Sequence, residues 1–202
     1  LIVNTIKICK KRPECLINAS GVGIYGFRGD EIINEESDPG DDFLAKLCRD
    51  WEKEADNATQ FNVRVVTIRT GIVLDKSGGA LKEFLLPFKF KFGAYQGSGN
   101  QWMPWIHLTD LRAAIVHAAC SPTLLGPVNG TAPQPERNAD FTRKLAAAVH
   151  RPAFFNAPGF ALKIALGGFG GALLAGQRAL PNALQADGFH FRYPTLEGAL
   201  AD

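Results

Sequence analysis

Residues 14–20, ECLINAS, and residues 61–74, FNVRVVTIRTGIVL, stand on either side of a polar segment, FLAKLCRDWEKEA, at 43–55. The first run is short, apolar and ends in small residues, which is typical of a buried parallel strand that leads into a loop. The second run is rich in β-branched residues and predicts another buried strand, which ends at Arg69. A helix between two such strands favours a parallel crossover, so we expect an α/β fold with a parallel sheet.

The segment between the two strands predicts an amphipathic helix. Asp41 and Asp42 precede it and can cap its first turn. Its apolar residues fall on one stripe and the acids at 52–54 lie opposite, which is the pattern of a helix with one buried face. The stripe consists of Leu44, Leu47, Cys48 and Trp51.

The flanking regions predict further elements. Residues 1–9 have helical spacing and are interpreted as the tail of a helix. Residues 80–93 predict a helix that ends at Pro87 and then an extended stretch. A long irregular segment follows at 94–105.

Beyond this point, Thr109 or Asp110 would start a helix. Residues 126–133 predict a short strand and turn, and Asn138 would cap a second helix. We expect these residues of the first helix to face inward: Leu111, Ala114, Ile115 and Ala118.

Composition excludes several classes of protein. The chain has 202 residues, of which 46% are hydrophobic and 21% charged, as expected of a globular protein. Residues 30–56 hold eleven acids against three bases, and the basic residues elsewhere form no continuous stripe, so nucleic-acid binding is not expected. Lys163 and Arg178 interrupt the apolar run at 153–180, which favours a buried helical layer over a membrane span.

The four cysteines show no CxxC pattern, so we expect reduced thiols in a cytoplasmic protein. No His, Cys or carboxylate spacing indicates a metal site.

The hexapeptide GVGIYG at 21–26 satisfies the GxGxxG pattern of dinucleotide-binding loops and follows a predicted strand. In such loops the third glycine lies in an opening apolar helix. Gly26 is followed instead by the polar residues FRGDEIINEES, so we reject the phosphate-cradle interpretation. The glycines more plausibly allow a tight turn or the close approach of a ligand.

Ser20 ends the first strand, where a ligand of a parallel α/β sheet usually binds, although a serine there can equally bond its own loop. Tyr25 is a candidate acid or a packing aromatic. Some dinucleotide-dependent reductases use a tyrosine whose pKa is lowered by a lysine four residues later. The position four residues after each tyrosine is Gly29, Gly99 or Glu197, so this chain has no YxxxK pair.

The stretch GSGNQWMPWIHLTDL at 97–111 combines flexible glycines with two tryptophans and His107. Aromatic rings beside glycine loops commonly frame a flat ligand, although tryptophans also serve as core packing. We favour a substrate-binding role for Gly97, Gly99, Trp102 and Trp105. His107 is a candidate general base, or a buried histidine with satisfied hydrogen bonds.

Six motifs together resemble one family, the atypical short-chain dehydrogenase/reductases related to nucleoside-diphosphate-sugar epimerases, whose members are often labelled epimerase or cell-division inhibitor. The motifs are INASGVGIYG, GDDFLAKLCRDWE, VVTIRTGIVL, GSGNQWMPWIHLTDL, GPVNGTAPQPERNADF and RALPNALQADGFHFRYPTLEGAL, and the resemblance spans essentially the whole chain.

The resemblance implies the C-terminal portion of a Rossmann-like parallel sheet with a smaller mixed substrate lobe and a helical C-terminal segment. It divides the chain into an incomplete NAD(P)-binding domain with interleaved substrate lobe at 1–150 and a family-specific helical segment at 151–202. It also implies NADP, or NAD, as cofactor, with the phosphate-binding loop absent from this chain.

The resemblance further assigns roles to individual residues. Ser20 resembles the active-site serine, and Gly71, Ile72 and Val73 resemble the loop that touches the nicotinamide end of NADP. Where family enzymes carry YxxxK, this chain has FLAKLC, with no phenol and with Lys46 out of register.

Two hypotheses follow. The first is an NADP-dependent epimerase or reductase of a nucleotide-linked substrate that uses another acid, Tyr25 or His107, in place of the tyrosine. The second is a catalytically inactive dinucleotide-binding regulatory or scaffold protein. In both we expect a small nucleotide-type molecule as the binding partner, and a homodimer is a further expectation.

Overall fold

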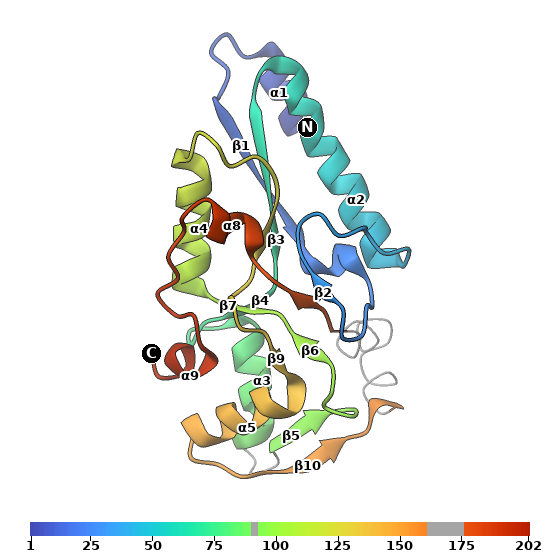
Figure 1. Ribbon diagram of the computed structural model, residues 1–202, viewed down its shortest axis with the longest axis vertical. Helices are drawn as coiled ribbons and strands as arrows, with labels where there is room; N and C mark the ends of the chain where they lie inside the picture. Colours follow the sequence, from blue (N-terminus) through green and yellow to red (C-terminus); the bar gives the residue numbers. More distant parts are fainter. Residues whose placement is uncertain (90–92, 161–175) are drawn as a thin grey trace.

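The computed structural model describes residues 1–89, 93–160 and 176–202. Its upper half in Figure 1 is a parallel sheet in the order β1-β3-β8. The strands are β1 (Cys15–Gly21), β3 (Arg64–Thr70) and β8 (Gly126–Gly130), and both pairings are parallel. The predicted α/β fold and its two first strands are therefore confirmed.

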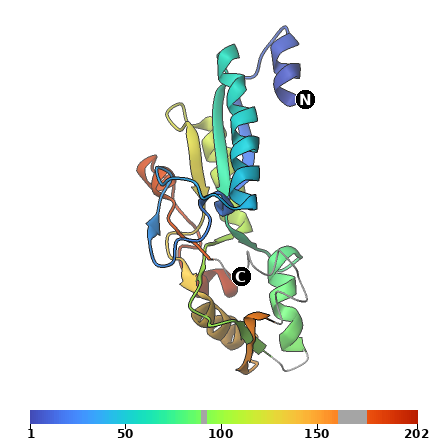
Figure 2. The same cartoon turned by 90° about the vertical axis from the view of Figure 1, so that its right-hand side faces the viewer.

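Helices cover both faces of this sheet. Helix α2 (Phe43–Asp56) lies on one face and α4 (Leu108–Cys120) on the other, as the two orthogonal views show (Figures 1 and 2). Ala114 and Ala118 of α4 are fully buried against the sheet, whereas Ile115, which we expected to face inward, is 39% exposed. The small alanines allow α4 to approach the strands closely, and Ile115 lies off that line.

Helix α2 packs through a different face from the one its apolar stripe predicts. The predicted cap is confirmed, because Asp42 accepts a hydrogen bond from the Ala45 amide at 2.8 Å. However, Leu47 and Trp51 of the stripe are 49% and 52% exposed, while Ala45 and Ala55 are buried. The physical reason is Glu52, whose carboxylate is bound at the sheet and so fixes the rotation of the helix about its axis, as described below.

The expected homodimer stays a prediction.

The lower half is a mixed lobe with its own core around Trp105, Phe141 and Leu145. Strand β4 pairs with β7 and β5 with β10, both parallel, and β6 pairs with β9 antiparallel. The elements are β4 (Ile72–Leu74), α3 (Gly79–Lys89), β5 (Gly93–Gln96), β6 (Trp102–Met103), β7 (Trp105–His107), β9 (Glu136–Arg137), α5 (Asn138–Ala148) and β10 (Ala153–Ala157).

Two boundaries in this lobe differ from the predictions. Helix α3 runs through Pro87 and ends at Lys89, because Phe88 is buried in the core and holds the last turn in place. Asn138 begins α5 but does not cap it. Its Oδ1 instead accepts a hydrogen bond from the Gln96 amide at 2.7 Å, which ties the helix to β5.

The remaining elements are short. They are α1 (Ile2–Ile8), η1 (Val22–Tyr25), β2 (Ile32–Ile33), η2 (Asn57–Phe61), β11 (Arg178–Ala179), α8 (Asn182–Ala186) and α9 (Leu196–Leu200). Strand β11 pairs with β2, so the C-terminal segment contacts the loop after β1. The helical layer predicted within 153–180 is wrong at its described ends, where residues 153–157 and 178–179 are strands because they pair with β5 and β2. The middle of that run, residues 161–175, lies outside the described residues, and the domain boundary near 150 stays a prediction. No helix among the described residues is long and apolar enough to span a membrane.

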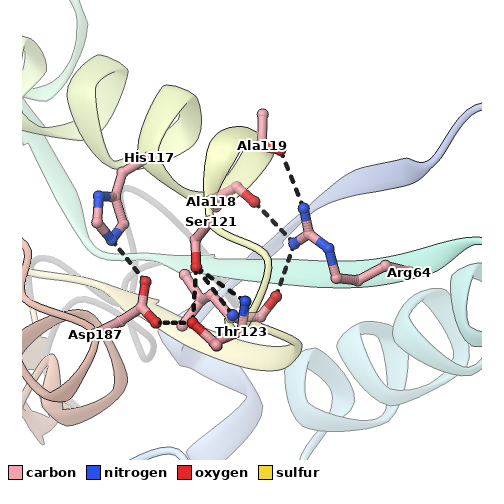
Figure 3. A network of polar contacts seen from close by, with 8 residues as sticks. Arg64, His117, Ala118, Ala119, Ser121, Thr123 and Asp187 are labelled. Atoms are coloured by element: carbon pink, nitrogen blue, oxygen red, sulfur yellow. Dashed lines mark hydrogen bonds and ion pairs between the residues drawn. The ribbon is translucent and has the colours of Figure 1, made fainter.

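A polar network fastens the segment after α8 to the end of α4 (Figure 3). His117 Nε2 lies 2.8 Å from Asp187 Oδ2, and the Thr123 hydroxyl donates to Asp187 Oδ1 at 2.6 Å. Arg64 of β3 donates to the carbonyls of Ala118 and Ala119, which have no partner inside the helix. Side chains from three separate elements thus hold this corner together.

Removing the Asp187 carboxylate should destabilise the protein. The hydrogen bond from Thr123 and the contact with His117 hold the pKa of Asp187 below its ordinary value. A depressed carboxylate pKa contributes stability above the unfolded-state pKa and loses it as the pH falls through the folded-state pKa. We expect Asp187→Ala in the full-length protein to cost about 1 kcal/mol at neutral pH, which is roughly 2–4 °C in Tm for this size.

Thermal unfolding of both proteins between pH 7 and pH 3 checks this, with exposed Asp50→Ala as the matched control. The difference in Tm should shrink on acidification. A difference that is absent at neutral pH, or that grows toward low pH, would contradict the assignment.

Candidate functional site

Three polar side chains form a row across the carboxyl ends of the parallel strands. Ser20 of β1 is in register with Arg69 of β3, and Arg69 is in register with Asn129 of β8. Residues in lateral register on parallel strands point to the same face of the sheet. All three are at least nine-tenths buried, so this edge is a polar site enclosed by protein. Ligands of open α/β sheets bind at this edge.

Glu52 of α2 is the counter-ion of Arg69, the charged residue of this row. Arg69 donates to both of its carboxylate oxygens, from Nε at 3.0 Å and from Nη2 at 2.8 Å. The Ser20 hydroxyl donates to Glu52 Oε1 at 2.7 Å. Burial alone would lower the pKa of Arg69, but the hydrogen bonds with Glu52 and Tyr25 raise it above its ordinary value, so the guanidinium stays charged. The fork-to-carboxylate geometry fixes the orientation of both groups.

Tyr25 closes the far side of the cluster. Its ring is fully buried, its hydroxyl donates to Asn129 Oδ1 at 2.7 Å, and it accepts from Arg69 Nη1 at 2.9 Å. Burial raises the pKa of Tyr25 and outweighs the lowering effect of Arg69, so the phenol is neutral. Because both hydrogen-bonding directions of the hydroxyl are taken, the geometry gives Tyr25 a positioning role. Its role as an acid stays a prediction.

Sequence reasoning identified Ser20 and Tyr25 but missed Glu52, Arg69 and Asn129. One signal was available: an arginine inside a buried β-branched strand requires a counter-ion. Asn18 was also missed. It lies two residues before Ser20, on the same face of β1, and its Nδ2 is buried without a partner among the described residues.

The glycine-rich hexapeptide has the local structure that we expected. Residues 22–25 form a single 3-10 turn, η1, and no α-helix begins at Gly26, since the next helix is α2. The loop after β3 is tightly packed: the Ile72 amide donates to the Pro104 carbonyl at 2.7 Å, and a Cβ at Gly71 would lie 2.3 Å from that oxygen. The close approach of Pro104 therefore leaves room only for glycine at position 71. Contact of Gly71, Ile72 and Val73 with a cofactor stays a prediction.

His107 lies elsewhere, at the junction of β7 and α4. Its Nδ1 accepts from the Thr109 amide at 3.2 Å, so the ring caps α4. It also packs on Tyr193, with ring centroids 4.1 Å apart. Among the described residues, no hydrogen bond links His107 to Ser20 or to Tyr25, whereas Ser20 and Tyr25 are joined through Glu52 and Arg69.

The loop at 97–102 lines a polar pocket of about 460 Å³. Trp102 is its aromatic wall: its indole donates to Asp30 at 2.9 Å, and Arg137 and Arg178 lie over its ring at 4.5 and 4.6 Å. Hydrogen bonds from Trp102 and Arg137 hold the pKa of Asp30 below its ordinary value. The pocket lining thus combines an aromatic side chain, one cation, Arg137, and one carboxylate, Asp30.

The other predicted residues of this loop have different environments. Gly97 and Gly99 have φ of 57° and 73°, a backbone region that favours glycine, and so shape the turn. Trp105 is fully buried and its indole donates to the Gln134 carbonyl at 2.9 Å. It forms the core of the lobe, and a substrate-binding role for it stays a prediction.

The chain matches known proteins over nearly its full length. Residues 157–202 match a family described as a domain of unknown function, DUF1731. An epimerase family protein of Mycobacterium tuberculosis is 45% identical over 92% of this chain and 62% of its own length. The crystal structure of human epimerase family protein SDR39U1 (isoform 2), solved with NADPH, superposes with a TM-score of 0.92, at 33% identity, over 99% of this chain and 68% of that chain.

The chain belongs to the SDR39U1-type epimerase family. A nucleoside-diphosphate sugar epimerase from Corynebacterium glutamicum is a further neighbour in structure, with a TM-score of 0.81 and 36% identity over 99% of this chain and 39% of that chain. The chain spans less than two thirds of the length of the curated relatives it matches. The predicted family and the Rossmann-like fold are confirmed.

Removing one partner of the Glu52–Arg69 ion pair should destabilise the protein more than replacing both partners with uncharged residues. In the full-length protein Glu52→Gln leaves a buried guanidinium without its counter-charge, and we expect a loss of about 3 kcal/mol. The double variant Glu52→Gln/Arg69→Met should lose clearly less than the sum of the single variants Glu52→Gln and Arg69→Met. Urea unfolding of the four proteins measures this cycle, with exposed Glu54→Gln as control. Additive losses would contradict the pairing.

Proposed function

We propose that the full-length protein is an NADP-dependent oxidoreductase with the epimerase-family fold that acts on a hydroxyl-bearing, nucleotide-linked small molecule. The carrying observation is the Ser20 hydroxyl at the carboxyl edge of the sheet, with its proton directed to Glu52. NADPH in the human relative's structure supports the choice of cofactor. The redox chemistry itself would come from the nicotinamide ring, which accepts or donates a hydride when bound.

Ser20 and Asn18 fit the nicotinamide end of such a ligand. The Ser20 oxygen donates its only proton to Glu52 and keeps acceptor capacity, and the buried Asn18 Nδ2 is a donor without a partner in the described part of the chain. An acceptor and a donor on one face of β1 suit an amide or a hydroxyl. We propose cofactor contacts also at Gly71, Ile72 and Val73, through side chains and carbonyls, because the Gly71 and Ile72 amides are already bonded to Gly130 and Pro104.

Ser20 orients the reacting hydroxyl group in this proposal. With its own proton on the Glu52 side, Ser20 can accept a hydrogen bond from a substrate O–H but cannot donate one to a carbonyl. The arrangement therefore favours oxidation of an alcohol: the C–H hydride goes to NADP, and the hydroxyl proton passes through Ser20 toward Glu52. Both Glu52 oxygens are already bound by Arg69, so the carboxylate must accept this proton while it is engaged in the ion pair, and we expect slow turnover.

The pocket beside Trp102 is the proposed site for the nucleotide-linked end of the substrate. Arg137 lines the pocket and supplies positive charge for phosphate oxygens, and the Trp102 ring holds Arg137 and Arg178 beside it through cation–π contacts. The loop at 26–31 leads from Tyr25 to this pocket, which places the two regions next to each other along the chain.

All four cysteines are free thiols, which supports a reducing, cytoplasmic location as part of the proposal.

One observation favours a second candidate, a dinucleotide-binding scaffold without turnover. Arg69, an ionisable group beside Ser20, is bonded both to Glu52 and to Tyr25. A cluster in which each group is already paired can hold the fold together without performing chemistry. Activity measurements separate the two candidates.

Replacement of Ser20 tests the proposed reaction. We expect full-length Ser20→Ala to lose about a hundredfold in kcat, while NADPH affinity falls much less, when NADP reduction is followed with a panel of nucleotide sugars and polyols. Exposed Ser77→Ala is the matched control. Wild-type protein that binds NADPH but turns over no member of the panel would support the scaffold. Equal kcat in Ser20→Ala and wild type would remove Ser20 from the reaction.

Replacement of Trp102 tests the pocket separately. Trp102→Ala should raise KM for a nucleotide-linked substrate about tenfold and leave kcat nearly unchanged, because the ring contributes binding energy to ground state and transition state alike. Steady-state kinetics give both constants, and exposed Trp51→Ala on α2 is the control. A fall in kcat with constant KM would place Trp102 at the reacting atoms and contradict the proposed division.

A further inference from the structure

A second pocket, of about 330 Å³, lies in the lower lobe on the side of His107. Its walls come from β4, α3, α5 and α9, four elements that share one hydrophobic core. The apolar side chains that line it are Leu74, Leu81, Leu85, Leu145, Val149 and Leu200. A concave site with continuous apolar walls is suited to an aliphatic group.

The mouth of this pocket is polar and carries an unpartnered donor. The His107 side chain is 10% exposed, and its Nδ1 accepts from the Thr109 amide, so the proton of the neutral ring is on Nε2. No described residue accepts a hydrogen bond from Nε2, and the nearest carboxylate oxygen, Asp202 Oδ2, is 3.8 Å away. The Nε2 proton at the edge of this apolar pocket is therefore available to a ligand acceptor.

Two cations accompany His107. Lys76 and Arg112 line the same pocket, and among the described contacts Arg112 forms no ion pair. The Asp202 carboxylate lies 3.8 Å from both Lys76 Nζ and His107 Nε2 and is held there by the Tyr193 hydroxyl. The Asp202 side-chain carboxylate thus lies beside this mouth at a distance too long for hydrogen bonds to these two groups, while Lys76 Nζ donates to the Asp202 main-chain oxygen at 3.1 Å.

We propose that this pocket binds a small aliphatic carboxylate. The ligand carboxylate would accept from His107 Nε2 and pair with Lys76 and Arg112 in place of Asp202, and the alkyl chain would lie against Leu81, Leu85 and Leu145. Two of the five ionisable groups at the mouth are acidic, Asp75 and Asp202, so an anion is favoured only when Asp202 moves aside. The inference is independent of the proposed redox function, because the pocket shares no residue with the Ser20 cluster.

Octanoate, below its micelle concentration, is the probe. Isothermal titration of the full-length protein without NADPH should show saturable one-site binding, with shifts in the methyl resonances of Leu81, Leu85 and Leu145. Octanol, which has the same chain without the charge, and butyrate, which has the charge without the chain, should each bind at least tenfold more weakly. Absence of saturation, or equal binding of octanol or butyrate, would overturn the proposal.

Two variants locate the carboxylate. His107→Asn keeps an N-cap for α4 but removes the Nε2 donor, and we expect octanoate binding to weaken about tenfold. Lys76→Ala should weaken it severalfold, whereas the exposed Lys46→Ala on α2 should leave it unchanged. Thermal unfolding confirms that His107→Asn is folded. Unchanged affinity in a folded His107→Asn variant would contradict the assignment.

Discussion

The ion pair between Glu52 and Arg69 is the interaction on which this architecture depends. Arg69 lies in the buried part of β3, residues 65–69, so its charge must be neutralised from the helix that covers the sheet. Binding of Glu52 at that point fixes the rotation of α2 about its axis. Small residues, Ala45 and Ala55, consequently face the strands, and the larger apolar residues of the helix remain on its outer side.

The same pair determines the chemistry at the carboxyl edge. Glu52 has two oxygens, both bound by Arg69, and one of them also accepts the Ser20 proton. The hydroxyl of Ser20 is therefore an oriented acceptor, and Tyr25 and Asn129 extend the hydrogen-bonded chain across the sheet. The site lacks the Tyr/Lys pair of the related enzymes, but it still has an ordered polar centre. That centre makes a slow or restricted reaction physically reasonable.

Much of the fold could be predicted from the sequence, because β-branched runs and capped amphipathic segments report local structure directly. The two strands around α2 and the helix at 108–120 are examples. The face of α2 and the passage of α3 through Pro87 could not be predicted, since each depends on a tertiary contact, with Arg69 and with the core around Phe88. Of the site, strand-end position indicated Ser20, whereas the lateral register that joins it to Arg69 and Asn129 appears only in three dimensions.

The most direct test of this account is a crystal structure of the full-length protein with NADP bound. We predict that the Ser20 oxygen lies within hydrogen-bond distance of the nicotinamide end of the ligand or of a substrate hydroxyl beside it, while the Glu52–Arg69 pair keeps its geometry. A structure in which another part of the protein covers Ser20, and the nicotinamide ring lies away from the row of Ser20, Arg69 and Asn129, would contradict it.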